Sequence, residues 1–248
     1  MQITVVGCSG SFPGPSSPAS CYLVEAGGTR IVLDLGNGAL GALQRHTDIY
    51  SVDAVLLSHL HADHCLDLCS YYVARKYRPE GPAPQLPVYG PRGSGARLAR
   101  AYDLPEQPGM NSEFDFHEHR PGPYAVGPLT ITAVRVVHPV EAYALRVEHA
   151  GRSVVYSGDT GPCEALVELA RGADLLVCEA SFVEGGANPP GLHLTGREAG
   201  EHAAAAGVPR LVLTHVPPWG DGQVALAEAR EVYDGELHLA EPGLVVDL

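Results

Sequence analysis

Short apolar runs alternate with amphipathic segments along the 248-residue chain. Runs of this length that end at glycine, proline or acidic residues predict buried or half-buried strands. Gly27 and Gly28 separate two such runs, so residues 21–36 are expected to form a hairpin. The expected strand segments are residues 2–7, 21–36 (the hairpin), 53–58, 129–139, 142–151, 152–161, 173–181, 210–218 and 236–241.

Helical spacing of apolar residues follows or separates these strands in both halves of the chain. The expected helices are residues 38–46, 65–77, 163–172, 195–208 and 223–233, whereas residues 79–127 are rich in proline and glycine and predict irregular surface with short elements. Two strand-rich halves, each with covering helices, predict an α/β fold: an αββα four-layer sandwich of two packed sheets. No stretch resembles a linker, so residues 1–248 are expected to form one domain.

Composition favours an ordinary soluble protein of the cytoplasm. The chain is 45% hydrophobic, but no apolar run approaches the roughly 18 residues of a membrane span, and no basic segment precedes the first strand. The six cysteines form no CxxC pair, which argues against a zinc ribbon or a redox motif and predicts reduced, mostly buried thiols.

The charge balance restricts the partners. Sixteen basic residues against 29 acidic ones give a formal net charge of −13. Proteins that grip a long polyanion normally present a basic face, and here only residues 74–79 and three arginines (Arg92, Arg97 and Arg100) are locally basic. A large RNA is therefore not expected as the main substrate.

The segment "LLSHLHADHCLD" carries the strongest chemical signal. His59, His61, Asp63 and His64 lie within six positions, directly behind the apolar run of residues 53–58. Residues two apart share one side in extended chain or a loop but not in a helix. Adjacent Asp63 and His64 point in different directions from each other. The simplest account has two metals, with His59 and His61 on the first and Asp63 and His64 on the second.

Three later residues can complete both ligand sets. His138, Asp159 and His215 each follow an apolar strand and lie one or two positions before glycine or proline, where a strand opens into a loop. Taken singly they would be ordinary structural or turn residues, but Asp159 can bridge two cations and so serve both sets. Imidazole with carboxylate suits two divalent metal ions, zinc first, with manganese or iron as alternatives.

These motifs resemble those of the metallo-β-lactamase superfamily. "SHLHADH" matches its HxHxDH signature, and His138, Asp159 and His215 match its later ligand motifs in order. "LDLG" is similar to the superfamily's early Asp-Gly strand end, which implies that Asp34 orients the metal-binding loops. "CEASF" and "LHLTG" resemble motifs of the ribonuclease Z-like branch. By that resemblance Glu179 would hydrogen-bond His193 and favour its charged form, and His193 would act as the catalytic acid.

The chain lacks the long arm with which ribonuclease Z commonly grips transfer RNA, because one strand pair separates His138 from Asp159. Together with further motifs such as "GCSGSFPGPSSPASCYL" and "VLTHVPPW", this resembles the atypical class II bacterial cyclic-AMP phosphodiesterases. The resemblance implies hydrolysis of a small-molecule cyclic nucleotide to its 5′-monophosphate. Water would attack phosphorus, Asp63 would orient that water, and His193 would protonate the departing oxygen.

Three alternatives stay open at this point. A ribonuclease Z-like nuclease would act on small or single-stranded RNA. Another hydrolase of the superfamily would cleave a thioester, lactone or lactam, chemistries that do not require Glu179 and His193. A non-catalytic binding protein could also have this hydrolase fold. The sequence also leaves the oligomeric state open, with a homodimer as one option, and indicates no membrane partner.

Overall fold

Two seven-stranded β-sheets form the centre of the molecule. The computed structural model describes residues 1–248. The first sheet contains β1 (Gln2–Gly7), β2 (Cys21–Ala26), β3 (Thr29–Leu33), β4 (Ala54–Leu56), β5 (Leu86–Gly90), β6 (Phe114–Glu118) and β14 (Val245–Asp247). The second contains β7 (Tyr124–Val126), β8 (Leu129–Arg135), β9 (Tyr143–His149), β10 (Arg152–Tyr156), β11 (Leu175–Glu179), β12 (Arg210–Thr214) and β13 (Glu236–Leu239).

The strand order gives each sheet an antiparallel part and a parallel part. The first sheet has the order β14-β1-β2-β3-β4-β5-β6, antiparallel up to β3 and parallel from β3 to β6. The second has the order β13-β12-β11-β10-β9-β8-β7, parallel from β13 to β10 and antiparallel beyond. Parallel strands end at the same edge, and this edge is where α/β proteins commonly bind their ligands.

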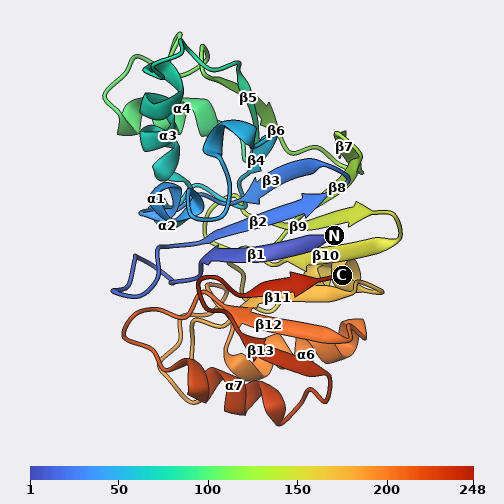
Figure 1. The fold of residues 1–248 in the computed structure, drawn as a ribbon. Helices are drawn as coiled ribbons and strands as arrows, with labels where there is room; N and C mark the ends of the chain where they lie inside the picture. Colours follow the sequence, from blue (N-terminus) through green and yellow to red (C-terminus); the bar gives the residue numbers. More distant parts are fainter.

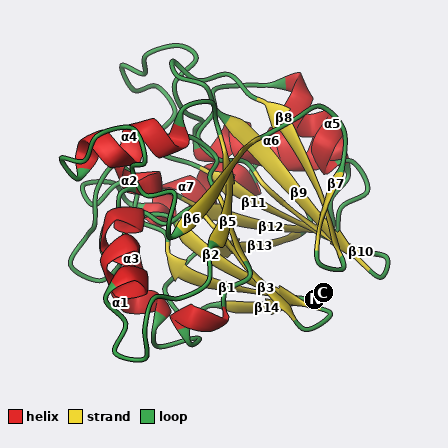
Figure 2. Ribbon diagram, turned by 90° about the horizontal axis from the view of Figure 1, so that it is seen from above, coloured by secondary structure: helices red, strands yellow, loops and turns green.

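Helices cover the outer face of each sheet (Figures 1 and 2). On the first sheet lie α1 (Ala39–Leu43), α3 (Asp67–Lys76) and α4 (Ser94–Ala101), with α2 (Ala62–Cys65) beside them and a 3₁₀ turn at Ile49–Ser51. On the second lie α5 (Glu164–Ala170), α6 (Gly196–Ala206) and α7 (Gly222–Arg230). The predicted αββα sandwich is therefore confirmed. None of the helices is both long and apolar enough to cross a membrane.

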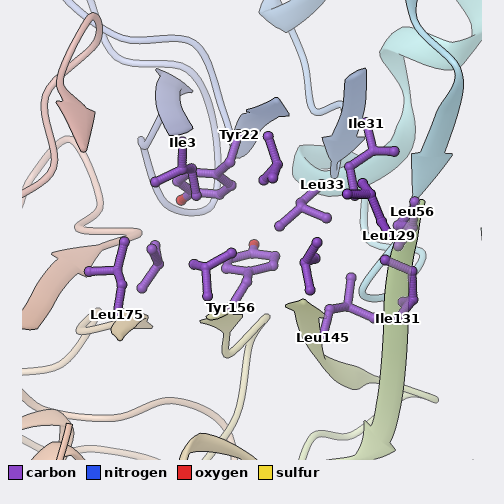
Figure 3. Close-up of a cluster of buried hydrophobic side chains, with 14 of the residues drawn as sticks. Ile3, Tyr22, Ile31, Leu33, Leu56, Leu129, Ile131, Leu145, Tyr156 and Leu175 are labelled. Atoms are coloured by element: carbon purple, nitrogen blue, oxygen red, sulfur yellow. The ribbon is translucent and has the colours of Figure 1, made fainter. Parts of the chain in front are cut away.

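Apolar side chains from both sheets interlock in the core between them (Figure 3). Alternate residues of each strand point into this layer, as the period of a half-buried strand requires. Tyr22 of the first sheet packs on Tyr156 of the second with ring centroids 4.8 Å apart. The hydroxyl of Tyr22 lies 2.6 Å from Thr214 Oγ1, and that of Tyr156 donates to Asp34 at 2.8 Å. The core thus ends in polar contacts at the strand ends that carry the candidate site.

The secondary structure differs from the sequence-based prediction in two places. Residues 79–127 supply β5, α4, β6 and β7, and β5 and β6 extend the first sheet in parallel. Their strand pattern is weak because Pro87 interrupts β5 and acidic residues alternate in β6. The strand β14 was not predicted, since it is short and partly exposed; it forms through pairing with β1, which lies at the other end of the sequence. All six cysteines are free, and all but Cys69 are buried.

Candidate metal centre

The predicted ligands meet where strands of both sheets end. His59, His61, Asp63 and His64 lie in the loop after β4 and the short helix α2 of the first sheet. The other three belong to loops of the second sheet: His138 after β8, Asp159 after β10 and His215 after β12. The strands β8, β10 and β12 run in the same direction, so their ends share one edge. Each sheet therefore supplies part of one cluster.

The first ligand group consists of His59, His61, His138 and Asp159. Their potential ligand atoms all lie within 4.8 Å of one another. His59 Nε2 is 3.0 Å from His61 Nδ1, which is 3.3 Å from His138 Nε2. His59 Nε2 is also 3.6 Å from Asp159 Oδ2. Three imidazoles and one carboxylate thus converge on one point.

The second group consists of Asp63, His64, His215 and again Asp159. His64 Nε2 lies 3.1 Å from His215 Nε2, and His215 Nε2 lies 3.2 Å from Asp63 Oδ2. Asp159 Oδ1 is 3.2 Å from His64 Nε2. Asp159 therefore presents Oδ2 to the first group and Oδ1 to the second, the arrangement expected of a bridging carboxylate.

Hydrogen bonds fix the tautomers of the histidines. His138 Nδ1 donates to the carbonyl of Leu192 at 2.9 Å. Ser181 Oγ donates to the His215 carbonyl at 2.8 Å, so it accepts from His215 Nδ1 at 2.9 Å. Ser58 Oγ likewise accepts from His59 Nδ1 at 3.1 Å, because its own proton is donated to Asp34. With Nδ1 occupied, each of these rings presents the Nε2 lone pair to the cluster.

Asp34 anchors the loop after β4 through hydrogen bonds. Its side chain is fully buried and accepts from the Ser58 amide at 2.6 Å, Ser58 Oγ at 2.7 Å, His64 Nδ1 at 2.7 Å and the Tyr156 hydroxyl at 2.8 Å. A carboxylate behind a histidine is a common way to orient a metal ligand. The position expected of Asp34 from the resemblance is the one it occupies.

The residues present fit divalent cations. Asp159 Oδ1 is buried yet has no hydrogen-bond donor, and the ring nitrogens His64 Nε2 and His215 Nε2 face each other. Such an arrangement leaves lone pairs unsatisfied unless a cation lies among them, because buried polar atoms normally have a partner. The two groups would each hold one metal ion, and the donor set suits zinc or manganese.

Glu179 and His193 lie directly beside the cluster. Glu179 ends β11 and is fully buried; its Oε1 accepts from His193 Nδ1 at 2.9 Å and from the Thr160 amide at 2.8 Å. His193 Nδ1 is also 3.9 Å from Asp159 Oδ2. The pair expected from the resemblance is thus in contact, and Glu179 links it to the loop that carries Asp159.

Burial and neighbouring charges shift the pKa values of several side chains in the centre. Burial, aided by the neighbouring His64, lowers the pKa of His59 well below 6.5, which keeps that ring neutral. Burial opposes ionisation of Asp159, but His215 and His64 outweigh it and hold the pKa of Asp159 well below 3.8. Burial also opposes charge on His193, yet the hydrogen bond and charge of Glu179 outweigh it and raise the pKa of His193 above 6.5. Burial opposes charge on His64 as well, but Asp159 and Asp34 outweigh it and raise the pKa of His64 well above 6.5. His193 differs from His64 in lying outside the two ligand groups, where a proton that it holds is not displaced by a bound cation.

Unusual backbone conformations fix the loops. Asp34 and His215 adopt positive φ angles of 56° and 59°, a region that non-glycine residues rarely occupy. Gly36 and Gly10 let neighbouring chain approach closely: a Cβ on Gly36 would meet the Asp63 carbonyl at 1.9 Å, and one on Gly10 would meet the His215 carbonyl at 2.2 Å. Larger residues at either glycine would displace a ligand.

Sequence reasoning missed the residues that orient the histidines. Ser58, Ser181 and Tyr156 were not singled out, although each is next to, or two to three positions from, a recognised motif residue. Serine beside a histidine is too common to signal this role, and the partners of Ser181 and Tyr156 are distant in sequence.

The fold and the paired ligand groups define a metal-dependent hydrolase framework, and comparison with known proteins identifies the family. The Beta-lactamase superfamily domain matches residues 29–216, so the chain belongs to the metallo-β-lactamase superfamily and is a metallo-hydrolase.

Three relatives show the range of the similarity. The uncharacterized protein Rv1339 of Mycobacterium tuberculosis (strain ATCC 25618 / H37Rv) is 49% identical over 243 residues, 96% of this chain and 89% of that protein. The probable metallo-hydrolase YhfI of Bacillus subtilis (strain 168) is 31% identical over 99% of both chains, and the crystal structure of YhfI superposes with a TM-score of 0.88. The ribonuclease Z of Mycolicibacterium paratuberculosis (strain ATCC BAA-968 / K-10) is 34% identical over 88% of this chain and 86% of that protein.

Proposed function

We propose that this metallo-hydrolase cleaves 3′,5′-cyclic nucleotides, cyclic AMP first among them, to 5′-monophosphates. The observation that carries the proposal is the contact between His193 Nδ1 and the buried Glu179 at 2.9 Å, next to the shared ligand Asp159. A protonated histidine at this place suits a reaction in which an alkoxide oxygen must leave. Hydrolysis of thioesters or lactams does not call for such a pair.

His193 and Asp63 have separate roles in the proposed reaction. When bound, two divalent cations lower the pKa of water and offset negative charge on the phosphoryl oxygens. His193 delivers a proton to the departing 3′ oxygen; its Nε2 makes no hydrogen bond within the chain, while Nδ1 is held by Glu179. Asp63, with one oxygen 3.2 Å from His215 Nε2, is placed to orient the attacking water. Cleavage of the bond between phosphorus and the 3′ oxygen, with addition of one water molecule, gives the 5′-monophosphate.

A nuclease acting on RNA is the second candidate, because the chain is 34% identical to a protein named ribonuclease Z. Two features favour the smaller substrate. The chain between His138 and Asp159 consists of the β9–β10 pair and its connections, with no arm, and the formal net charge is −13. Electrostatic repulsion of this kind weakens binding to a long polyanion.

Product analysis tests the proposal. Metal-loaded protein is incubated separately with 3′,5′-cyclic AMP, with a precursor transfer RNA and with bis(4-nitrophenyl) phosphate. The proposal predicts 5′-AMP from the first, intact RNA in the second and coloured product from the third. Cleavage of the reporter without cyclic AMP hydrolysis would leave a phosphodiesterase with another substrate, and trimming of the RNA would favour the nuclease.

The role of His193 is tested in the same assay. His193→Ala should lower kcat by about 100-fold to 10,000-fold, the usual contribution of a general acid, with unchanged metal content. His202→Ala is the control, because His202 is a buried histidine whose ring accepts from the Cys163 amide, away from the ligand groups. Full activity of His193→Ala at neutral pH would rule out the acid role.

A further inference from the structure

We propose that a pocket beside His61 binds the nucleobase and that Arg97 is its specificity-determining residue, an inference that rests on the proposed function. The pocket has a volume of about 370 Å³. Three segments line it: Leu60, His61 and Ala62 before and within α2; Pro91, Arg92 and Arg97 from the β5–α4 region; and Val140 with Glu141 from the β8–β9 loop.

The pocket adjoins the metal centre through one shared residue. His61 belongs to both, because its Nδ1 lies 3.3 Å from His138 Nε2 while its side chain also lines the pocket. Val140, which also lines the pocket, follows the candidate ligand His138 by two residues. A substrate whose phosphate lies among the ligands must extend its nucleoside into an adjoining space. A larger pocket of about 540 Å³, around Cys8 and Thr214, includes none of the predicted ligands.

The walls suit the flat faces of a nucleobase. Leu60, Pro91 and Val140 provide apolar surface, and Val140 is 38% exposed. Burying such surface against an aromatic ring is favourable in proportion to the area removed from water.

Arg97 is the polar group of the pocket that is free to bind. Its guanidinium makes no ion pair or hydrogen bond in the chain, whereas Arg92 Nε lies 3.8 Å from Glu118 and Glu141 accepts from the Tyr143 hydroxyl at 2.7 Å. A guanidinium offers several donors in one plane and can stack on an aromatic ring or donate to ring nitrogens and carbonyl oxygens of a base. Arg97 therefore gives the apolar slot its polar contact.

Isothermal titration calorimetry on the metal-loaded protein tests the assignment with two probes, 5′-AMP and ribose 5-phosphate. The wild type should bind 5′-AMP at least about tenfold more tightly, since only this probe fills the pocket. Arg97→Met should weaken 5′-AMP binding by about tenfold, the cost of one charge-assisted hydrogen bond, and leave ribose 5-phosphate binding unchanged. Arg100→Met is the matched control, because Arg100 lies on the same helix and pairs with Glu106 outside the pocket.

A second pair of variants tests the pocket without Arg97. Val140→Glu should fill the slot and abolish the preference for 5′-AMP, whereas Val224→Glu should not, although Val224 on α7 is exposed to the same 38%. Metal content measured on each variant shows that the centre is intact.

Three results would overturn the inference: equal affinity of the wild type for both probes, an unchanged 5′-AMP affinity in both Arg97→Met and Val140→Glu, or an equal loss for both probes in Arg97→Met. Failure of cyclic AMP hydrolysis with the probe preference intact would instead overturn the proposed function and leave the base pocket standing.

Discussion

Asp34 offers the sharpest test of how the loops hold the centre. Asp34→Asn keeps the shape of the side chain, and asparagine, like aspartate, tolerates the positive φ of 56° at this position. The substitution removes the charge and turns one acceptor oxygen into a donor. The backbone and the volume stay the same, so the effect reports on the four hydrogen bonds that Asp34 accepts.

The magnitude follows from the geometry. The amide oxygen can keep the place of Oδ2, which accepts from Ser58 Oγ, His64 Nδ1 and the Tyr156 hydroxyl. The amide nitrogen then faces the Ser58 N–H, a buried donor left without an acceptor, at a cost of about 1–3 kcal/mol. Bonds to a neutral acceptor are weaker by about 1 kcal/mol each. The loss of stability should therefore be about 4–6 kcal/mol, a large part of the total for a typical domain.

Urea unfolding and metal competition measure the two consequences. The unfolding midpoint should fall, and affinity for zinc, measured against a chromogenic chelator, should fall by about 10-fold to 100-fold because His64 loses its support. Asp53→Asn is the control, since Asp53 is exposed and accepts one bond from the Arg30 amide. If Asp34→Asn matched Asp53→Asn in both measurements, the account of Asp34 as the support of the loop would be refuted.

Three further predictions concern the ligands. Asp159→Ala should reduce bound metal from two equivalents to less than one by elemental analysis, because both groups share this carboxylate; two retained equivalents would exclude the bridge. Gly36→Ala should lower metal affinity, because its Cβ would press on the Asp63 carbonyl, whereas Gly41→Ala in α1, with open space around it, should stabilise the fold by up to about 1 kcal/mol. Equal metal affinity in the two glycine variants would contradict this. Dialysis against a chelator should abolish phosphodiester hydrolysis, and added zinc or manganese should restore it; activity that survives complete metal removal would disprove metal dependence.

Much of the fold could be predicted because its strands are buried and strongly patterned. Segments such as β1 and β11 are mostly apolar and almost wholly buried, and the helix α6 begins at a capping box between Thr195 and Glu198. The strands β5, β6 and β14 escaped prediction because their stability comes from pairing with distant chain rather than from their own composition. Alternation alone does not reveal such neighbours.

The candidate site, like the fold, could be predicted only in part. Seven candidate ligands could be named because their residue types are rare in this spacing, and the structure brings all seven into two groups that share Asp159. The supports Ser58, Ser181 and Tyr156 could not be named, because hydroxyl groups are common and their partners are set by packing. The proposed nucleobase pocket is likewise formed by three segments that are separate in the sequence, and the sequence showed Arg97 only as one of a few locally basic residues.

The division of the ligands between two sheets also bears on how the protein responds to metal supply. Four candidate ligands come from the first sheet and three from the second, so each ligand group is complete only when the two halves are docked. Ligands that bind the native state alone shift the folding equilibrium toward it. Melting temperature and resistance to proteases should therefore rise with the concentration of free metal, and cells starved of metal would lose this protein through degradation as well as through inactivity.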